Sequence, residues 1–67
     1  MPKFTAEQRA AIAAEYDGYA DGREQVAADL ESKGHSVAAE FQRDLASDYR
    51  DVSDAARASS SALNRIY

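Results

Sequence analysis

Apolar positions along this chain recur every three or four residues in two long segments that are separated by one short break. In the first segment they are Ile12, Tyr16, Tyr19, Arg23, Val26 and Leu30, with Arg23 as the polar member of the series. In the second they are Phe41, Leu45, Tyr49, Val52, Ala56, Ser59, Leu63 and Ile66. Alternating spacings of three and four keep one stripe on one face of a helix, as in coiled coils, whereas a strand needs a spacing of two. The pattern predicts two α-helices, about 6–32 and 37–65.

Residues with helix-ending and helix-starting preferences lie at the expected boundaries. Gly34, in the break at 33–36, suits the position after a helix end, and Ser36 suits the N-cap of the next helix. At the start of the first helix, Thr5 and Gln8 have the spacing of a capping box. These residues predict where the first helix begins and where the chain turns.

Two Asp-Gly pairs, at 17–18 and 21–22, interrupt the first segment. Each glycine costs about 1 kcal/mol relative to alanine inside a helix. We expect one weakened or kinked helix, because the tyrosine stripe passes through this stretch. The alternative is a true turn here, which would give three helices near 6–17, 23–33 and 37–65.

Folding the chain back at Gly34 brings the two stripes into one antiparallel register. Facing residues of a hairpin have position numbers that add up to one constant, and five pairs share it: Leu30 with Ala38, Tyr19 with Tyr49, Tyr16 with Val52, Ile12 with Ala56 and Thr5 with Leu63. The sequence therefore predicts an all-α fold, an antiparallel αα-hairpin in a single small domain over 1–67.

Two helices alone cannot surround the large apolar side chains of both stripes. We expect an exposed apolar flank that includes Phe4, Val37, Ile66 and Tyr67. Small scaffolds often meet this shortage by oligomerising. The expected assembly is a homodimer in which two hairpins form a four-helix bundle.

Composition narrows the class of protein. The chain has 67 residues, 15 of them alanine, no cysteine and a net charge of −4. Without cysteine there is no disulfide, thiolate nucleophile or cysteine zinc site, and the acidic balance disfavours nucleic acid and anionic lipid. No apolar run approaches the roughly 20 residues that span a bilayer. We expect a cytoplasmic protein that contacts no membrane.

Residues with catalytic or metal-binding potential are few. His35, the one histidine, falls in the predicted turn, and no serine–carboxylate arrangement accompanies it. Glu40, Asp44 and Asp48 recur every four residues and could present oxygen ligands to a divalent cation, although a solvated acidic face explains them more simply. We therefore expect no enzyme activity, no cofactor and no metal site.

Tyrosines and arginines supply the candidate interface instead. Tyrosines cluster midway along the predicted hairpin, as core residues or as anchors for a partner. Arg23 lies inside the apolar stripe, where it either extends to solvent or fixes the register. Three other arginines recur every seven residues, as a docking stripe for an acidic partner or as members of helix-local pairs such as Glu40–Arg43 and Arg50–Asp54. The candidate partner or dimer interface comprises Tyr16, Tyr19, Arg23, Tyr49, Arg43, Arg50, Arg57, Ile66 and Tyr67.

Residues 4–17 also resemble the opening helix of transposase-type helix-turn-helix domains. That resemblance implies a recognition helix near 36–48, where Arg43 is the one arginine against three carboxylates. Contacts to phosphates and bases need more basic and amide groups, so direct nucleic-acid binding is not expected.

The leading hypothesis for function is a small non-enzymatic module that binds another protein as an accessory or regulatory factor. Its short length and alanine-rich composition suggest a phage or other mobile element as one possible source. The alternative hypothesis is a nucleic-acid-associated regulator, acting through a degenerate helix-turn-helix or as an acidic competitor of a DNA-binding protein.

Overall fold

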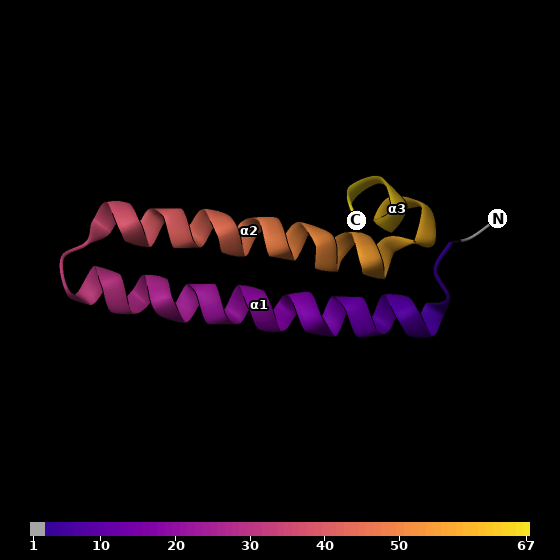
Figure 1. Cartoon of the computed structure of the whole chain (residues 1–67), viewed down its shortest axis with the longest axis horizontal. Helices are drawn as coiled ribbons and strands as arrows, with labels where there is room; N and C mark the ends of the chain where they lie inside the picture. The colour runs from indigo at the N-terminus through magenta and orange to yellow at the C-terminus, as the bar shows by residue number, and fades with distance from the viewer. Residues whose placement is uncertain (1–2) are drawn as a thin grey trace.

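Two long antiparallel helices and a short third one make up the protein, as a computed structural model shows for residues 3–67. Helix α1 spans Ala6–Ser32, α2 spans Ser36–Ala58 and α3 spans Ser60–Ile66. The hairpin is 49 Å long and 17 by 12 Å across. Helix α3 folds back at the open end, beside the end of α2 (Figure 1). The predicted all-α hairpin is confirmed.

The chain enters and leaves α1 through two well-formed caps. The hydroxyl of Thr5 accepts a hydrogen bond from the backbone of Gln8 at 3.0 Å, and the Gln8 side chain accepts one from the backbone of Thr5 at 2.9 Å. At the other end, Gly34 has φ of 83°, and the backbone N–H groups of Gly34 and His35 donate to Glu31 and Leu30. This pairing of donors is a Schellman motif, which needs a residue free to adopt positive φ.

Helix α1 is continuous through Gly18 and Gly22, so the alternative with a turn at 17–22 is wrong. Neither glycine has a heavy atom within 4 Å of the position that a Cβ would occupy, apart from its own helix and neighbours. Packing against α2 therefore does not require a glycine at either position. The contacts along the whole of α1 outweigh the cost of both glycines.

Helix α2 differs from its prediction at both ends. His35, rather than Ser36, is its N-cap, and no side chain caps it, because Ser36 already lies in the first turn. The helix ends at Ala58, since Ser59 adopts an extended conformation with φ of −172° and ψ of 164°. Its hydroxyl accepts from the backbone of Ala62 at 2.9 Å and so begins α3. Serine competes with helix continuation through this bond, which outweighs the periodicity that predicted one helix to 65.

Small residues, rather than the predicted stripes, fill the contact between α1 and α2. We call them the seam; its members are at most 2% exposed and recur every seven residues: Ala13, Ala20 and Ala27 on α1, and Ala39, Ala46 and Ser53 on α2. Small side chains allow two helices to approach closely, and the large apolar residues consequently lie beside the seam. The contact between the rings of Tyr19 and Tyr49 and the packing of Ile12 on the cluster that contains Ala56 agree with the predicted antiparallel register.

Helix α3 closes the open end of the hairpin over a small core. Leu63 is fully buried with Ala13 and Ala56, and Phe4, Ile12 and Val52 pack around them. The backbone N–H of Phe4 donates to the hydroxyl of Ser60 at 3.0 Å, which ties the two ends of the chain together.

Candidate interaction surface

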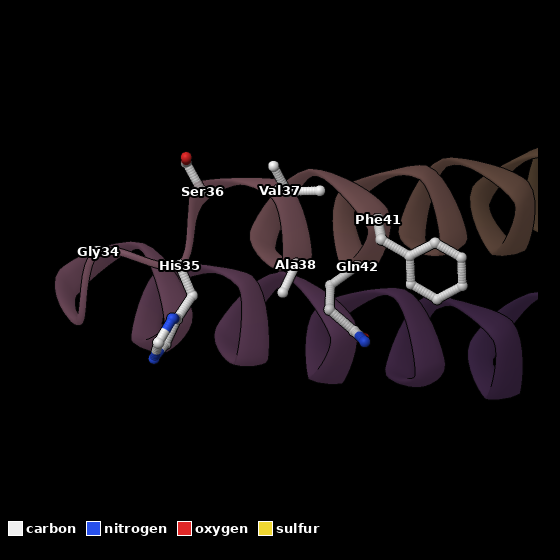
Figure 2. Close-up of a pocket in the computed structure, with 7 residues that line it drawn as sticks. All are labelled: Gly34, His35, Ser36, Val37, Ala38, Phe41 and Gln42. Carbon is white, nitrogen blue, oxygen red and sulfur yellow. The ribbon is translucent and has the colours of Figure 1, made fainter.

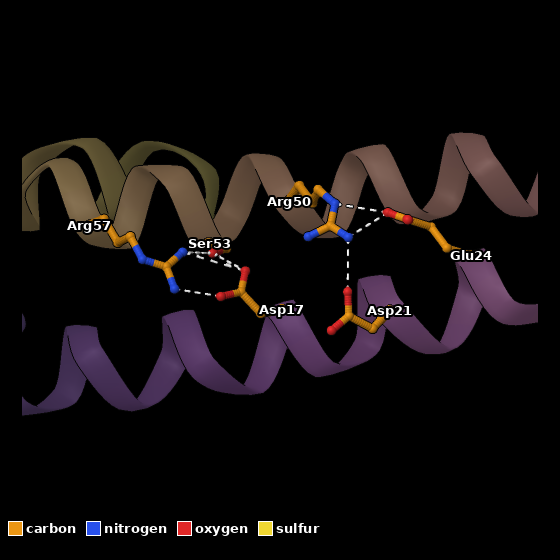
Figure 3. A network of polar contacts seen from close by, with 6 residues as sticks. All are labelled: Asp17, Asp21, Glu24, Arg50, Ser53 and Arg57. Carbon is orange, nitrogen blue, oxygen red and sulfur yellow. Dashed lines mark hydrogen bonds and ion pairs between the residues drawn. The ribbon is translucent and has the colours of Figure 1, made fainter.

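Charged residues line one side of the seam, which we call the ion-pair edge (Figure 3). At the end of this edge nearest α3, Arg57 pairs with the carboxylate of Asp17 across the two helices. The buried hydroxyl of Ser53 donates to the same carboxylate at 2.5 Å and accepts from Arg57. These bonds lower the pKa of Asp17 to about 2, the bond from Arg57 having the larger effect.

The other two arginines of the heptad row are used in the same way. Arg50 reaches Glu24 through its Nε at 2.9 Å and Asp21 through its Nη2 at 2.9 Å (Figure 3). Its pKa is raised, mainly by the bond to Glu24. Arg43 pairs with Glu31 nearer the turn. The sequence also suggested the pairs Glu40–Arg43 and Arg50–Asp54 within α2. Among the described residues, Arg43 and Arg50 instead pair with acids of α1.

Heptad spacing explains why the pairs cross between the helices. Arg43, Arg50 and Arg57 fall on one edge of α2, while Glu31, Glu24 and Asp17 fall on the facing edge of α1 with the same spacing. Each arginine therefore meets its own acid only in the observed antiparallel register. The ion-pair edge fixes alignment within the hairpin, and its arginines already have carboxylate partners.

Aromatic side chains gather on the opposite side of the seam. The ring of Tyr16 lies 5.2 Å from that of Tyr19 and 5.9 Å from that of Tyr49, and Tyr19 lies 5.5 Å from Tyr49. The predicted tyrosine cluster is confirmed. Burial is the main cause of a raised pKa at Tyr16, and the hydrogen bond from the Tyr19 hydroxyl to Glu15 is the main cause at Tyr19.

The end of the chain extends this cluster in a way that the periodicity did not predict. Because α3 folds back, the ring of Tyr67 lies 5.9 Å from that of Tyr16 and 5.7 Å from that of Phe4. Tyr67 and its neighbour Ile66 are nevertheless 59% and 47% exposed. The tyrosine cluster thus continues onto the surface at the open end.

Large apolar residues continue from the cluster toward the turn, beside the seam. We call this surface the apolar edge; helical spacing places on it Ile12, Tyr16, Tyr19, Val26 and Leu30 of α1, and Phe41, Leu45, Tyr49 and Val52 of α2. Ile12 and Val52 are covered by the core under α3. Toward the turn, Tyr19 is 45% exposed, Val26 40% and Phe41 61%. The apolar edge is therefore closed at one end and open along the rest.

One polar pair lies within the apolar edge. The Nη1 of Arg23 donates to the side-chain oxygen of Gln42 at 3.1 Å, across the two helices. Arg23 is exposed and spans from α1 to α2 at the surface of the edge. Arg23 extends to solvent, which is the first of its two predicted roles. It also forms a hydrogen bond from α1 to α2, as the second role, fixing the register, would need.

A shallow hollow lies at the turn, where the apolar edge ends (Figure 2). It is lined by residues of the turn and the first turns of α2, including His35, Val37, Phe41 and Gln42. Val37 is 84% exposed, as expected from the sequence. Phe41 lines the hollow and also belongs to the apolar edge, so the two surfaces meet at this residue.

Within residues 3–67, the structure gathers no group of three histidine, cysteine or carboxylate side chains that could hold a metal ion. The row of Glu40, Asp44 and Asp48 is exposed on α2. In the same described part of the chain, no helix has the length and apolar character needed to cross a membrane.

Comparisons with known proteins assign no family to this arrangement. No protein family model matches the chain, and no curated protein or solved structure is significantly similar to it.

Two features of the surface were missed by the sequence patterns. The heptad spacing of the seam is visible at Ala13, Ala20 and Ala27, but alanine favours helices on any face, so its spacing alone does not identify a contact surface. The stripes of large residues predict Val26 and Phe41 as core positions, but both are exposed because the small residues of the seam occupy the contact between the helices.

Proposed function

We propose that this chain is a small, non-enzymatic protein-interaction module that binds a helix of another protein along its apolar edge. The supporting observation is the exposure of Tyr19, Val26 and Phe41 on one continuous surface. Large apolar side chains gathered on one face of a small protein are typical of an interaction site. Tyrosine is also enriched among the residues that contribute most to binding.

The ion-pair edge supports the assignment of the apolar edge as the binding surface. Arg43, Arg50 and Arg57 engage acids of α1, so an acidic partner at that edge would have to compete with bonds inside the hairpin. Among the described residues, the apolar edge between Tyr19 and the turn has no ion pair across the helices, and its one polar contact across them joins Arg23 to the neutral Gln42. Binding there would bury apolar surface without breaking an existing ion pair.

Association of two hairpins into a four-helix bundle is a second way to cover the same surface. The homodimer that the sequence predicts stays a prediction, and it would use the apolar edge as well. Sedimentation equilibrium at micromolar concentration separates the two assemblies, because the dimer has twice the mass of the 7.3 kDa chain.

Site-specific photo-crosslinking in the native cell tests the proposal. A photoreactive amino acid at Phe41 probes the apolar edge, and the same amino acid at Asp51, exposed on the other side of α2, is the matched control. We expect a protein adduct from position 41 and none from position 51. Adducts from 51 alone, or from neither position, would contradict the proposal.

A further inference from the structure

Acidic side chains flank the apolar edge where its open part begins. On α2, Asp48 lies three residues after Leu45 and four before Val52, so helical spacing puts it beside both. On α1, Glu15 lies three residues after Ile12 and four before Tyr19 and accepts a hydrogen bond from the Tyr19 hydroxyl. Both carboxylates belong to exposed residues. The apolar surface is thus flanked by negative charge on each helix.

Positive charge is concentrated away from this border. Arg43, Arg50 and Arg57 pair with acids on the ion-pair edge. Lys33 pairs with Asp29 at 3.0 Å near the turn. Arg23 is the exception, because it lies in the apolar edge itself and bonds to the neutral side chain of Gln42. A ligand of the apolar edge therefore meets carboxylates at the rim and one arginine within the edge.

The edge already accommodates a helix at its closed end. Leu63 of α3 is fully buried against the end of the hairpin where Ile12 and Val52 lie. From Tyr19 to Leu30 the uncovered part extends about 17 Å, or three helical turns, at 1.5 Å per residue. A second helix of that length would match the uncovered part and could lay its apolar face against it, as amphipathic helices do on apolar surfaces of their partners.

We propose that the occupant of the apolar edge is a basic amphipathic α-helix of a partner protein. Its apolar residues, three and four positions apart, cover Tyr19, Val26 and Phe41, and its flanking lysines or arginines face Asp48 and Glu15. This inference rests on the proposed function and specifies the chemistry of its ligand. A second copy of the chain is the less favourable occupant, since it brings the same acidic rim against Asp48 and Glu15.

Titration of the full chain with two synthetic peptides tests the inference. One is an 18-residue amphipathic helix of leucine and lysine, and the other has glutamate in place of every lysine. Binding is followed by backbone amide chemical shifts in ¹⁵N-labelled protein. We expect the lysine peptide to bind, with the largest shifts at Tyr19, Val26 and Phe41, and the glutamate peptide to bind far more weakly.

A matched pair of charge reversals separates this site from general attraction to an acidic protein. Asp48→Lys changes the rim, and Asp51→Lys makes the same change on the same helix beside the ion-pair edge. Both residues are exposed, and circular dichroism verifies that both variants stay helical. We expect Asp48→Lys to weaken binding of the lysine peptide by about three- to tenfold at low salt, and Asp51→Lys to change it by less than about twofold.

Each contrary result has a distinct meaning. Equal binding of both peptides at the apolar edge would overturn the basic partner and leave the proposed function intact. Equal losses from Asp48→Lys and Asp51→Lys, or shifts centred on Arg50 and Arg57, would overturn the inference. A dimer that buries Tyr19 and Phe41 would identify a second copy as the occupant and would also overturn it. Failure of both peptides to shift any residue of the apolar edge of the monomer would remove the support for both proposals.

Discussion

Asp17 shows how much a single side chain depends on its partners from another helix. Its carboxylate accepts hydrogen bonds from Ser53 and Arg57, and its pKa falls to about 2. Nothing near Asp17 in the sequence signals this, because both partners lie more than 35 positions away. In the sequence, Asp17 is half of an Asp-Gly pair that indicates a turn. In the structure it holds α1 against α2.

Replacing Asp17 with asparagine is expected to lower stability at neutral pH and to flatten its dependence on acid. A carboxyl whose folded pKa lies below its unfolded value stabilises the fold above the unfolded pKa. That stabilisation is lost as the pH falls from about 4 to about 2, and unfolding at pH 3 takes up about 0.8 proton at this group. Thermal unfolding of the wild type and Asp17→Asn between pH 2 and 7 measures the effect.

Asp48→Asn serves as the control for this measurement. Asp48 is exposed and, among residues 3–67, makes no ion pair, so its replacement removes a charge of the same sign without breaking a contact between the helices. The two variants should differ most at pH 5 to 7 and converge near pH 2. Identical pH profiles would show that the bonds to Asp17 contribute nothing to stability.

At the scale of elements, the two long helices present three different surfaces to one another and to solvent. The seam of small residues brings the helices together, the ion-pair edge fixes their register, and the apolar edge is left beside them. All three surfaces repeat every seven residues, so each of them follows its own line along the helices without crossing the other two. The periodicity of large residues alone detects just one of the three.

Enlarging a seam residue is expected to force the helices apart. Ala46→Leu adds three carbons at a position that is 2% exposed, and overpacking of this kind typically costs about 1–3 kcal/mol. For a domain of this size, each kcal/mol lowers Tm by about 4–8 °C. The measurement is thermal unfolding followed by circular dichroism at 222 nm.

Ala28→Leu makes the same substitution on the exposed face of α1 and is the matched control. Leucine has nearly the helix propensity of alanine, so this variant should unfold within about 0.5 kcal/mol of the wild type. If Ala46→Leu changed the stability as little as Ala28→Leu, the inference that the helices pack closely at the seam would be wrong.

At the scale of the whole molecule, α3 decides which part of the apolar edge is covered. It folds back instead of continuing α2, buries Leu63 and brings Tyr67 to Tyr16. The same change of direction lets Ser60 accept a hydrogen bond from the backbone of Phe4. A continuous second helix would have carried Leu63 away from the core with Ala13 and Ala56.

Removing the Leu63 side chain is expected to destabilise the fold and to release α3. Leu63→Ala leaves a cavity in the small core, and such truncations cost about 2–5 kcal/mol. Helix α3 is too short to persist without this contact. Hydrogen exchange should therefore accelerate at Ala62 to Tyr67 before it accelerates in α1.

Asn64→Ala, at an exposed position of the same helix, should leave that exchange pattern unchanged. Protection of α3 that survived Leu63→Ala would show that the core contact does not hold it.

The sequence by itself determined the helical class, the limits of α1 and the turn at Gly34. These features depend on local causes: spacing of three and four, the Thr5 capping box and the positive φ of a glycine. The sequence also predicted the tyrosine cluster, because the apolar stripes of the two helices match in one antiparallel register. Only the tertiary structure decided that small residues fill the seam and that Arg43, Arg50 and Arg57 pair across the helices. It also decided that the chain turns back at Ser59. The physical reason is that the seam, the ion-pair edge and the apolar edge have the same heptad spacing. Which of them forms the contact between the helices is decided by close packing, and packing requires both helices to be in place.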